Sequence, residues 1–233
     1  MALIVVTATR SSREAFMSDS PLGKSLPKVG DLTPLRLHGF FENSNPLGDC
    51  YNEAIAAAGA DDTLLFIHDD VYVNDWMMGW RVQEALMHFD VVGVAGNRRR
   101  QPGQETWYLQ PSRMEGDTRV MTTFDHGHLS GAIGHGSLEQ WTLTNYGPTP
   151  QPVQLIDGVF MAVNAGRVKE SGVLFDPALG FHLYDLDFCR SASAAGLKIG
   201  TWPIAITHAS SGGSIHSEAW AVSSQKYLAK WGG

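Results

Sequence analysis

The feature that most constrains the fold is a five-residue run, T-L-L-F-I at residues 63–67, that carries no charged side chain. A strand with apolar side chains on both faces is typical of a sheet that helices cover on both sides. Short apolar runs of the same kind occur at residues 2–8 and 91–95, and a further strand is expected at 35–41. The sequence therefore predicts an α/β fold.

Helix signals separate these strands. Asn45 followed by Pro46 is typical of a helix start, with Asn45 as N-cap and Pro46 in the first helical position. Asn74 or Asp75 is expected to cap the next helix, at residues 76–89. This alternation predicts an open, doubly wound, mostly parallel twisted sheet with helices on both faces.

The second part of the chain has a different composition. Residues 98–152 are rich in Gly, His, Pro and Thr, which favours hairpins and long loops that could cover a cleft. Regular structure is predicted at 153–163, as a helix at 185–195, as a strand at 198–207 and as a terminal helix at 217–231, whereas residues 20–34 are expected to be irregular.

Composition excludes some classes of protein. The 17 basic and 24 acidic residues give a formal net charge of −7, which argues against nucleic-acid binding, and the cluster Arg98–Arg100 indicates a solvated loop or a local anion contact. The two cysteines, Cys50 and Cys189, are expected to be reduced thiols within helices, which suits a cytoplasmic protein. No apolar run reaches the length of a membrane span, so any membrane contact is expected to be peripheral.

The first candidate site is His68-Asp69-Asp70, directly after the run at 63–67. Ligands of open α/β sheets bind at the carboxyl ends of the strands. Adjacent carboxylates repel each other unless a cation or hydrogen bonds compensate, and Mg²⁺ and Mn²⁺ prefer oxygen ligands. Side chains alternate along an extended chain, so His68 and Asp70 should face the same side, and we expect Asp70 to contact the metal. The alternative is an acidic turn without a ligand.

The second candidate is Asp185, at or just before the start of a helix. The helix N-terminus is expected to keep this carboxylate ionised, so that it could accept a proton from a hydroxyl group. A capping role alone would also explain it. Asp187 should point elsewhere and be structural.

Histidines supply two further candidates. His208 ends the last predicted strand and precedes a small-residue loop, Ala209–Ser214, of the kind that lets backbone N–H groups approach a phosphate. His126, His128 and His135 invite a zinc interpretation, but their spacing fits no usual zinc pattern, and a flexible acceptor-binding loop is favoured.

The order of these features resembles the family-2 glycosyltransferases, over nearly the whole chain. An acidic turn near residue 70, a central Asp157-Gly158, the Tyr184-Asp185-x-Asp helix start and a late strand-end His208 carry the resemblance. The I-H-D-D-V and F-H-L-Y-D-L-D segments look most like a bacterial subgroup related to a streptomycin-biosynthesis protein.

The resemblance implies a role for each matching residue. Asp185 falls on the catalytic base, and the metal would be Mn²⁺ or Mg²⁺, bound by Asp70 and His208. His68 stands where the family more often has Asp, and Tyr184 replaces a residue that is commonly acidic. The residues expected to bind the nucleotide or donor are Thr7, Thr9, Arg10, Glu42, His68, Asp69 and Asp157, with contact to the metal as the alternative for His68. Those expected on the acceptor side are His182 and Tyr184.

The function implied is inverting transfer of a sugar from a UDP-, dTDP- or GDP-linked donor to a hydroxyl of a glycan, lipid-linked glycan or glycoconjugate. The resemblance implies one domain of the GT-A type over residues 1–233, with a nucleotide-binding half at about 1–97 and an acceptor-side, catalytic half at about 98–233. Two other classes remain as alternatives: a nucleotide-sugar-binding domain without catalysis, and a metal-dependent phosphoesterase, which usually needs more clustered ligands.

Overall fold

The computed structural model describes residues 2–111, 113–115, 118–120, 123–137, 139–209 and 217–232, with only the backbone of 113–115 and 118–120. It has the predicted α/β class, with a largely parallel sheet between helices. The small-residue loop predicted to approach a phosphate lies, beyond Ala209, outside the described residues.

The larger sheet has seven strands. β1 (Leu3–Ala8) pairs in parallel with β2 and β3, and β5 pairs in parallel with β14, whereas β13 is antiparallel to both β3 and β5. Five of the seven strands therefore run in one direction, and β11 and β13 run in the other. In order, the remaining strands are β2 (Leu35–Phe40), β3 (Thr63–Ile67), β13 (Phe160–Asn164), β5 (Val91–Gly93), β14 (Ile199–Thr201) and β11 (Gln151–Pro152).

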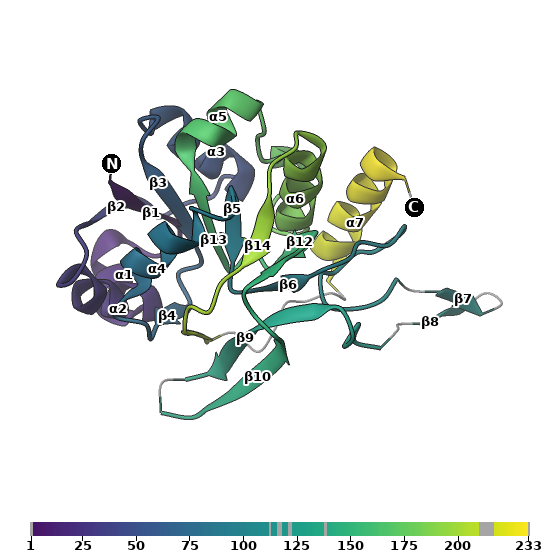
Figure 1. Ribbon diagram of the computed structural model, residues 1–233, viewed down its shortest axis with the longest axis horizontal. Helices are drawn as coiled ribbons and strands as arrows, with labels where there is room; N and C mark the ends of the chain where they lie inside the picture. Colours follow the sequence, from purple (N-terminus) through teal and green to yellow (C-terminus); the bar gives the residue numbers. More distant parts are fainter. Residues whose placement is uncertain are drawn as a thin grey trace.

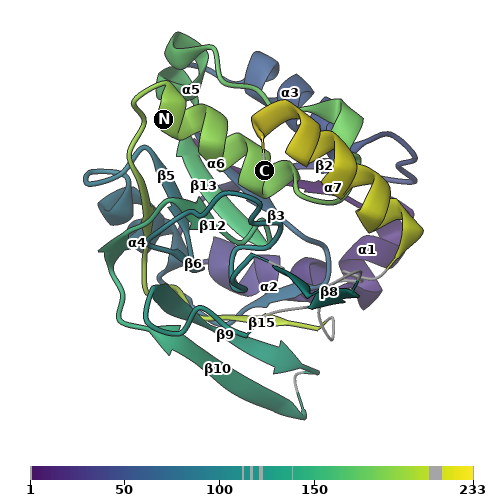
Figure 2. The same ribbon diagram turned by 90° about the vertical axis from the view of Figure 1, so that its right-hand side faces the viewer.

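Helices lie on both faces of this sheet. Figure 2 shows α3, α5 and α6 on one side and α1, α2 and α4 on the other. Phe66 of β3 packs against Tyr51 of α3, with ring centroids 4.6 Å apart. The helices are α1 (Arg13–Asp19), α2 (Pro21–Gly30), α3 (Leu47–Ala57), α4 (Met78–Ala85), α5 (Ala165–Ser171), α6 (Tyr184–Ala194) and α7 (Glu218–Trp231), with a 3₁₀ turn η1 at Pro177–Leu179.

A second sheet carries the predicted hairpins. β9 (Leu129–Gly136) and β10 (Trp141–Gly147) form a long antiparallel pair at one end of the molecule (Figure 1). β9 continues the sheet through β15 (Ile206–His208) to β4 (Val71–Val73) on one side. On the other side lie β6 (Ala95–Asn97) and β12 (Leu155–Ile156), and β7 (Arg113–Glu115) pairs separately with β8 (Thr118–Val120).

Two strands that we predicted as continuous are each divided between the sheets. Residues 91–95 form β5 in one sheet and begin β6 in the other. At this junction Gly131 of β9, with φ 100°, lies so close to the Val94 carbonyl that a Cβ would not fit. Residues 198–207 divide into β14 and β15, and Pro203, which has no N–H to donate, lies between them. Apolar periodicity does not reveal such a change of sheet because both halves are buried.

Three helix predictions were wrong in detail. Residues 20–34 are not irregular but contain α2, which Ser20 caps by accepting the Gly23 N–H and which tolerates Pro27 within it. The predicted helix at 76–89 is regular only over α4. Pro46, not Asn45, is the N-cap residue of α3.

The predicted state of the cysteines is confirmed. Cys50 in α3 and Cys189 in α6 are both buried and free. The two sheets and the surrounding helices share one hydrophobic core. Within the described part of the chain, no helix combines the length and the apolar character that crossing a bilayer requires.

Candidate functional site

The turn His68-Asp69-Asp70 carries the chain from one sheet to the other. It follows β3 and leads directly into β4, and the His68 N–H donates to the Val159 carbonyl at 3.3 Å. Asp69 turns toward β1, where its Oδ2 accepts the Thr9 hydroxyl at 2.5 Å. The alternation expected from the sequence thus separates Asp69 from His68 and Asp70.

His68 and Asp70 meet His208 from β15. Among the described residues, these three form a group whose ligand atoms, one from each side chain, lie within 4.8 Å of one another. His208 Nε2 is 3.2 Å from Asp70 Oδ2. The antiparallel pairing of β15 with β4, which sets His208 opposite Val71, brings the histidine to the turn.

This group fits a divalent cation. Asp70 Oδ1 is buried and has no hydrogen-bond partner among the described residues, which is costly for a carboxylate oxygen unless a cation or hydrogen bond satisfies it. Two imidazole nitrogens and one carboxylate are common ligands of first-row divalent metals.

The group also perturbs the titration of its members. Burial lowers the pKa of His68. Burial opposes charge on His208 as well, but the hydrogen bond and negative charge of Asp70 outweigh it and raise the pKa of His208. Burial would raise the pKa of Asp70, and the two histidines instead bring it below its ordinary value. Asp70 and His208 thus favour an ion pair, whereas His68 stays neutral.

Asp185 lies in the first turn of α6 and faces the segment Asp157-Gly158. Its Oδ2 accepts the Gly158 N–H at 2.9 Å and its Oδ1 accepts the Leu186 N–H at 2.9 Å. Burial, reinforced by the charge of Asp157, raises the pKa of Asp185 to about 7 despite these bonds. The expectation that the helix N-terminus keeps it ionised therefore holds only above about pH 7, because desolvation outweighs the backbone donors.

Tyr184 connects the two groups. Its hydroxyl donates to the Gly158 carbonyl at 3.0 Å and lies 2.7 Å from His68 Nε2. Asp187, by contrast, points away: it is fully buried, and Lys230 and Trp231 of α7 donate to its carboxylate at 3.0 and 2.7 Å. Its contacts agree with the structural role predicted for it.

One cavity of about 510 Å³ is lined by the three members of the cation group together with Asp157, Tyr184 and Asp185. Its polar side includes the cation group, which is His68, Asp70 and His208, and the carboxylates of Asp157 and Asp185. Aromatic side chains form much of the rest. The lining includes His68, Asp70, His135, Asp157, Tyr184, Asp185 and His208 on the polar side and Trp107, Tyr108, Phe124, Tyr146, Phe181, His182 and Trp220 around them.

The three histidines of the middle region are not one loop. His135 belongs to β9, where it pairs with His208 across the parallel ladder and lines the cavity, so the loop prediction was wrong for this residue. His126 stacks on Phe124, and His128 Nδ1 lies 3.4 Å from Asp125. Sequence reasoning missed His135 as a cavity residue because its neighbour across the ladder is distant in the chain.

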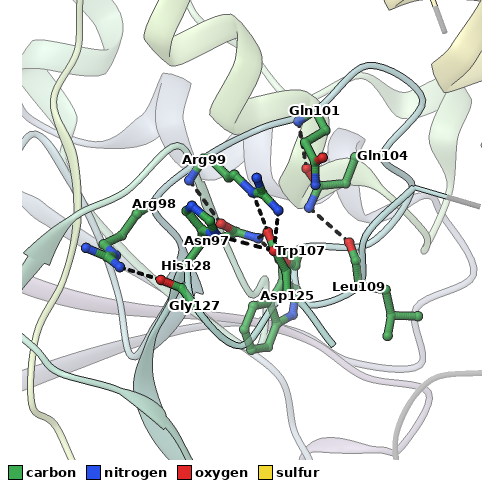
Figure 3. A network of polar contacts seen from close by, with 10 residues as sticks. All are labelled: Asn97, Arg98, Arg99, Gln101, Gln104, Trp107, Leu109, Asp125, Gly127 and His128. Atoms are coloured by element: carbon green, nitrogen blue, oxygen red, sulfur yellow. Dashed lines mark hydrogen bonds and ion pairs between the residues drawn. The ribbon is translucent and has the colours of Figure 1, made fainter. Parts of the chain in front are cut away.

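A buried polar network holds the loop that carries Trp107 (Figure 3). Asn97 Nδ2 donates to the Trp107 carbonyl and to Asp125 Oδ2, both at 3.0 Å. Arg99 donates to the two Asp125 oxygens at 2.8 and 2.5 Å, which agrees with the predicted local anion contact of the arginine cluster. Side-chain hydrogen bonds from Arg99 and Asn97, with burial opposing them, bring the pKa of Asp125 to about 2. No feature of the sequence indicated that Trp107, which this network supports, lines the cavity.

Three of the seven predicted nucleotide- or donor-binding residues line a second cavity, of about 530 Å³, beyond the turn. Thr9, Arg10 and Asp69 line it, together with segment 43–47, and Phe181 borders both cavities. His68 and Asp157 line the larger cavity instead. The other two predicted residues line neither cavity: Thr7 is fully buried in β1, and Glu42 is exposed with φ 51°.

Comparisons with known proteins give a distant likeness. No family model matches the sequence, and no curated protein is similar to it, so the streptomycin-biosynthesis subgroup stays a prediction. Solved structures with a similar arrangement include A197 from STIV, with a TM-score of 0.47, 11% identity, and coverage of 87% of this chain and 82% of that one.

Two further structures extend the comparison. TarS of S. aureus has a TM-score of 0.49 and 13% identity over 91% of this chain and 37% of its own. The mannosyltransferase PcManGT of Pyrobaculum calidifontis, in complex with GDP-Man and Mn²⁺, has a TM-score of 0.47 and 11% identity over 97% of this chain and 61% of its own. The chain spans less than two thirds of both proteins. TM-scores below 0.5 are too low to identify an activity.

Proposed function

We propose that this chain is a metal-assisted, inverting glycosyltransferase that moves a sugar from a nucleotide-sugar donor to a hydroxyl acceptor. Asp185 is the general base, and Asp70 and His208 hold Mn²⁺ or Mg²⁺. The observation that carries the proposal is that one cavity is lined both by the cation group and by the carboxylates of Asp157 and Asp185. Transfer from a diphosphate donor needs both: charge stabilisation for the leaving group and a base for the acceptor.

In the proposed chemical step, Asp185 acts on the hydroxyl group of the acceptor. Asp185 in its ionised form takes the proton of the acceptor hydroxyl. The acceptor oxygen forms a bond to the anomeric carbon from the side opposite the diphosphate, and the bond from that carbon to the diphosphate oxygen breaks. A single displacement inverts the anomeric centre. A bound cation would supply charge neutralisation for the departing nucleoside diphosphate.

The surroundings suggest where each substrate binds. We assign the nucleoside to the second cavity, near Thr9, Arg10 and Asp69, with Thr7 and Glu42 as supporting residues of that end of the sheet. A uridine, thymidine or guanosine diphosphate donor would extend past Asp157 into the larger cavity. The acceptor, a glycan or glycoconjugate, would approach along His182 and Tyr184.

The assignment of halves is part of the same proposal. Residues up to about 97 would bind the nucleotide, and the remainder would bind the acceptor and supply Asp185. β13 and β14, from the second half, complete the sheet of the first half, so the two functions would share one scaffold within a single domain.

An isosteric pair of variants tests the base. Asp185→Asn removes the proton acceptor with little change in shape, so transfer should fall by about 10²-fold or more while donor binding is retained. Asp187→Asn, two residues further along the same helix, is the control and should keep the transfer rate of the folded protein. The measurement is sugar transfer with donor affinity measured in parallel. Transfer by Asp185→Asn at the wild-type rate would exclude this residue as the base.

A further inference from the structure

We propose that His68 is a third cation ligand, and that the resulting site selects transition ions that accept imidazole, such as Co²⁺ and Mn²⁺, over Mg²⁺. This rests on the proposed function of the same cavity and decides the role of His68, which the sequence left open between the nucleotide and the metal. It also narrows the choice between Mn²⁺ and Mg²⁺.

The hydrogen-bond network fixes which nitrogen of His68 carries the proton. The Tyr184 hydroxyl has one hydrogen, which it donates to the Gly158 carbonyl at 3.0 Å. At the 2.7 Å contact with His68, Tyr184 must therefore accept, so Nε2 carries the proton. Nδ1 keeps its lone pair, as a metal ligand must. A ligating histidine commonly donates its other N–H in this way, which holds the ring in place.

Tyr184 is held firmly in this position. Its side chain is 3% exposed, and its ring packs edge-on against Tyr51 with centroids 5.9 Å apart. Gly158 allows the approach, because a Cβ there would lie 2.4 Å from the Tyr184 hydroxyl oxygen. Tyr184 is thus a positioning residue for His68, in addition to lining the acceptor side of the cavity.

The composition of the ligand group decides the preference. Mg²⁺ takes oxygen ligands in near-ideal octahedral geometry, whereas imidazole suits first-row transition ions. Within the described part of the chain, His68 and His208 supply two nitrogens to this group, Asp70 alone supplies oxygen, and its buried Oδ1 has no hydrogen-bond partner. Exchanging His68 for a carboxylate would give a site with mainly oxygen ligands, which suits Mg²⁺ better.

Calorimetric titration of the chelator-treated protein tests this without a nucleotide. CoCl₂, MnCl₂ and MgCl₂ are titrated into the wild type, His68→Asp, Tyr184→Phe and His88→Ala. His88 is an exposed histidine that stacks on Trp202, so it is the matched control for adventitious binding. The wild type and His88→Ala should bind Co²⁺ at least about tenfold more tightly than Mg²⁺.

The variants should separate the ligand from its positioning residue. His68→Asp should weaken Co²⁺ and strengthen Mg²⁺, and Tyr184→Phe should weaken Co²⁺ by roughly 10- to 100-fold. Equal affinity of the wild type for Co²⁺ and Mg²⁺, or an unchanged preference in His68→Asp, would overturn the inference. Binding of nucleotide sugars that is equally tight with Mg²⁺ and with Co²⁺ would also overturn the inference. That result would leave the proposed transferase activity uncontradicted. Selective Co²⁺ binding without any nucleotide-sugar binding would support the His68 site and contradict the transferase.

Discussion

The protonation of Asp185 connects the geometry of this residue to a rate. Its pKa of about 7 arises because burial and the charge of Asp157 disfavour the ionised form. A general base acts when deprotonated, so activity should rise with pH across this value. Between pH 6 and pH 8 the ionised fraction grows from about one tenth to about nine tenths, and kcat/KM should increase roughly tenfold. A pH profile measured at saturating cation checks this, and a flat profile over that range would contradict it.

Single residues were predictable where the signal is local. Asp70 follows a strand, His208 ends one, and Asp185 lies at the start of a helix, so their position at the sheet edge could be inferred from the sequence. His135 and Trp107 could not be assigned in this way. Their place at the cavity depends on pairing across a ladder and on a loop held by Asn97. The raised pKa of Asp185 was not predicted because burial is a property of the packed molecule.

At the level of elements, the hydrogen-bond network at the end of β6 holds the loop that carries Trp107, one of the aromatic residues that line the larger cavity. Asn97 is fully buried and bonds Asp125, the Trp107 carbonyl and the Arg99 N–H. Asn97→Ala leaves a buried carboxylate oxygen and a carbonyl short of a donor, which should lower the free energy of unfolding by about 2–4 kcal/mol.

Urea denaturation measures this loss. Arg98→Ala is the control, because Arg98 is exposed and its side chain bonds only the Gly127 carbonyl among the described contacts, at 2.6 Å, while its backbone N–H, which the substitution keeps, donates to the His128 carbonyl. This variant should change stability by no more than about 0.5 kcal/mol. Equal losses in the two variants would show that the buried network does not stabilise this loop.

Element types were more predictable than their limits. The alternation of apolar runs and capping signals correctly predicted β1, β3 and α7. The change of sheet after β5 and the helix α2 were missed. A strand that passes from one sheet to another stays apolar throughout, and Pro and Gly within α2 conceal a helix that Ser20 starts and tertiary packing completes.

At the scale of the whole molecule, the candidate site lies where the two sheets meet. β3 of the larger sheet ends in the His68–Asp70 turn, and β15 of the second sheet brings His208 to it. α6 adds Asp185 from a third direction. The ligand group therefore depends on the packing of both sheets, which explains why its parts are separated by more than a hundred residues.

Cation-dependent donor binding tests the central claim most directly. Thermal unfolding of the wild type and Asp70→Ala is followed with UDP-, dTDP- and GDP-sugars, with Mn²⁺ or with a chelator. A ligand that binds only the native state at about 100 times its Kd adds about 2.7 kcal/mol of stability. One nucleotide class should raise the wild-type Tm with Mn²⁺, and neither the chelator sample nor Asp70→Ala should respond. Equal stabilisation with the chelator present, or none by any nucleotide sugar with Mn²⁺, would contradict the account.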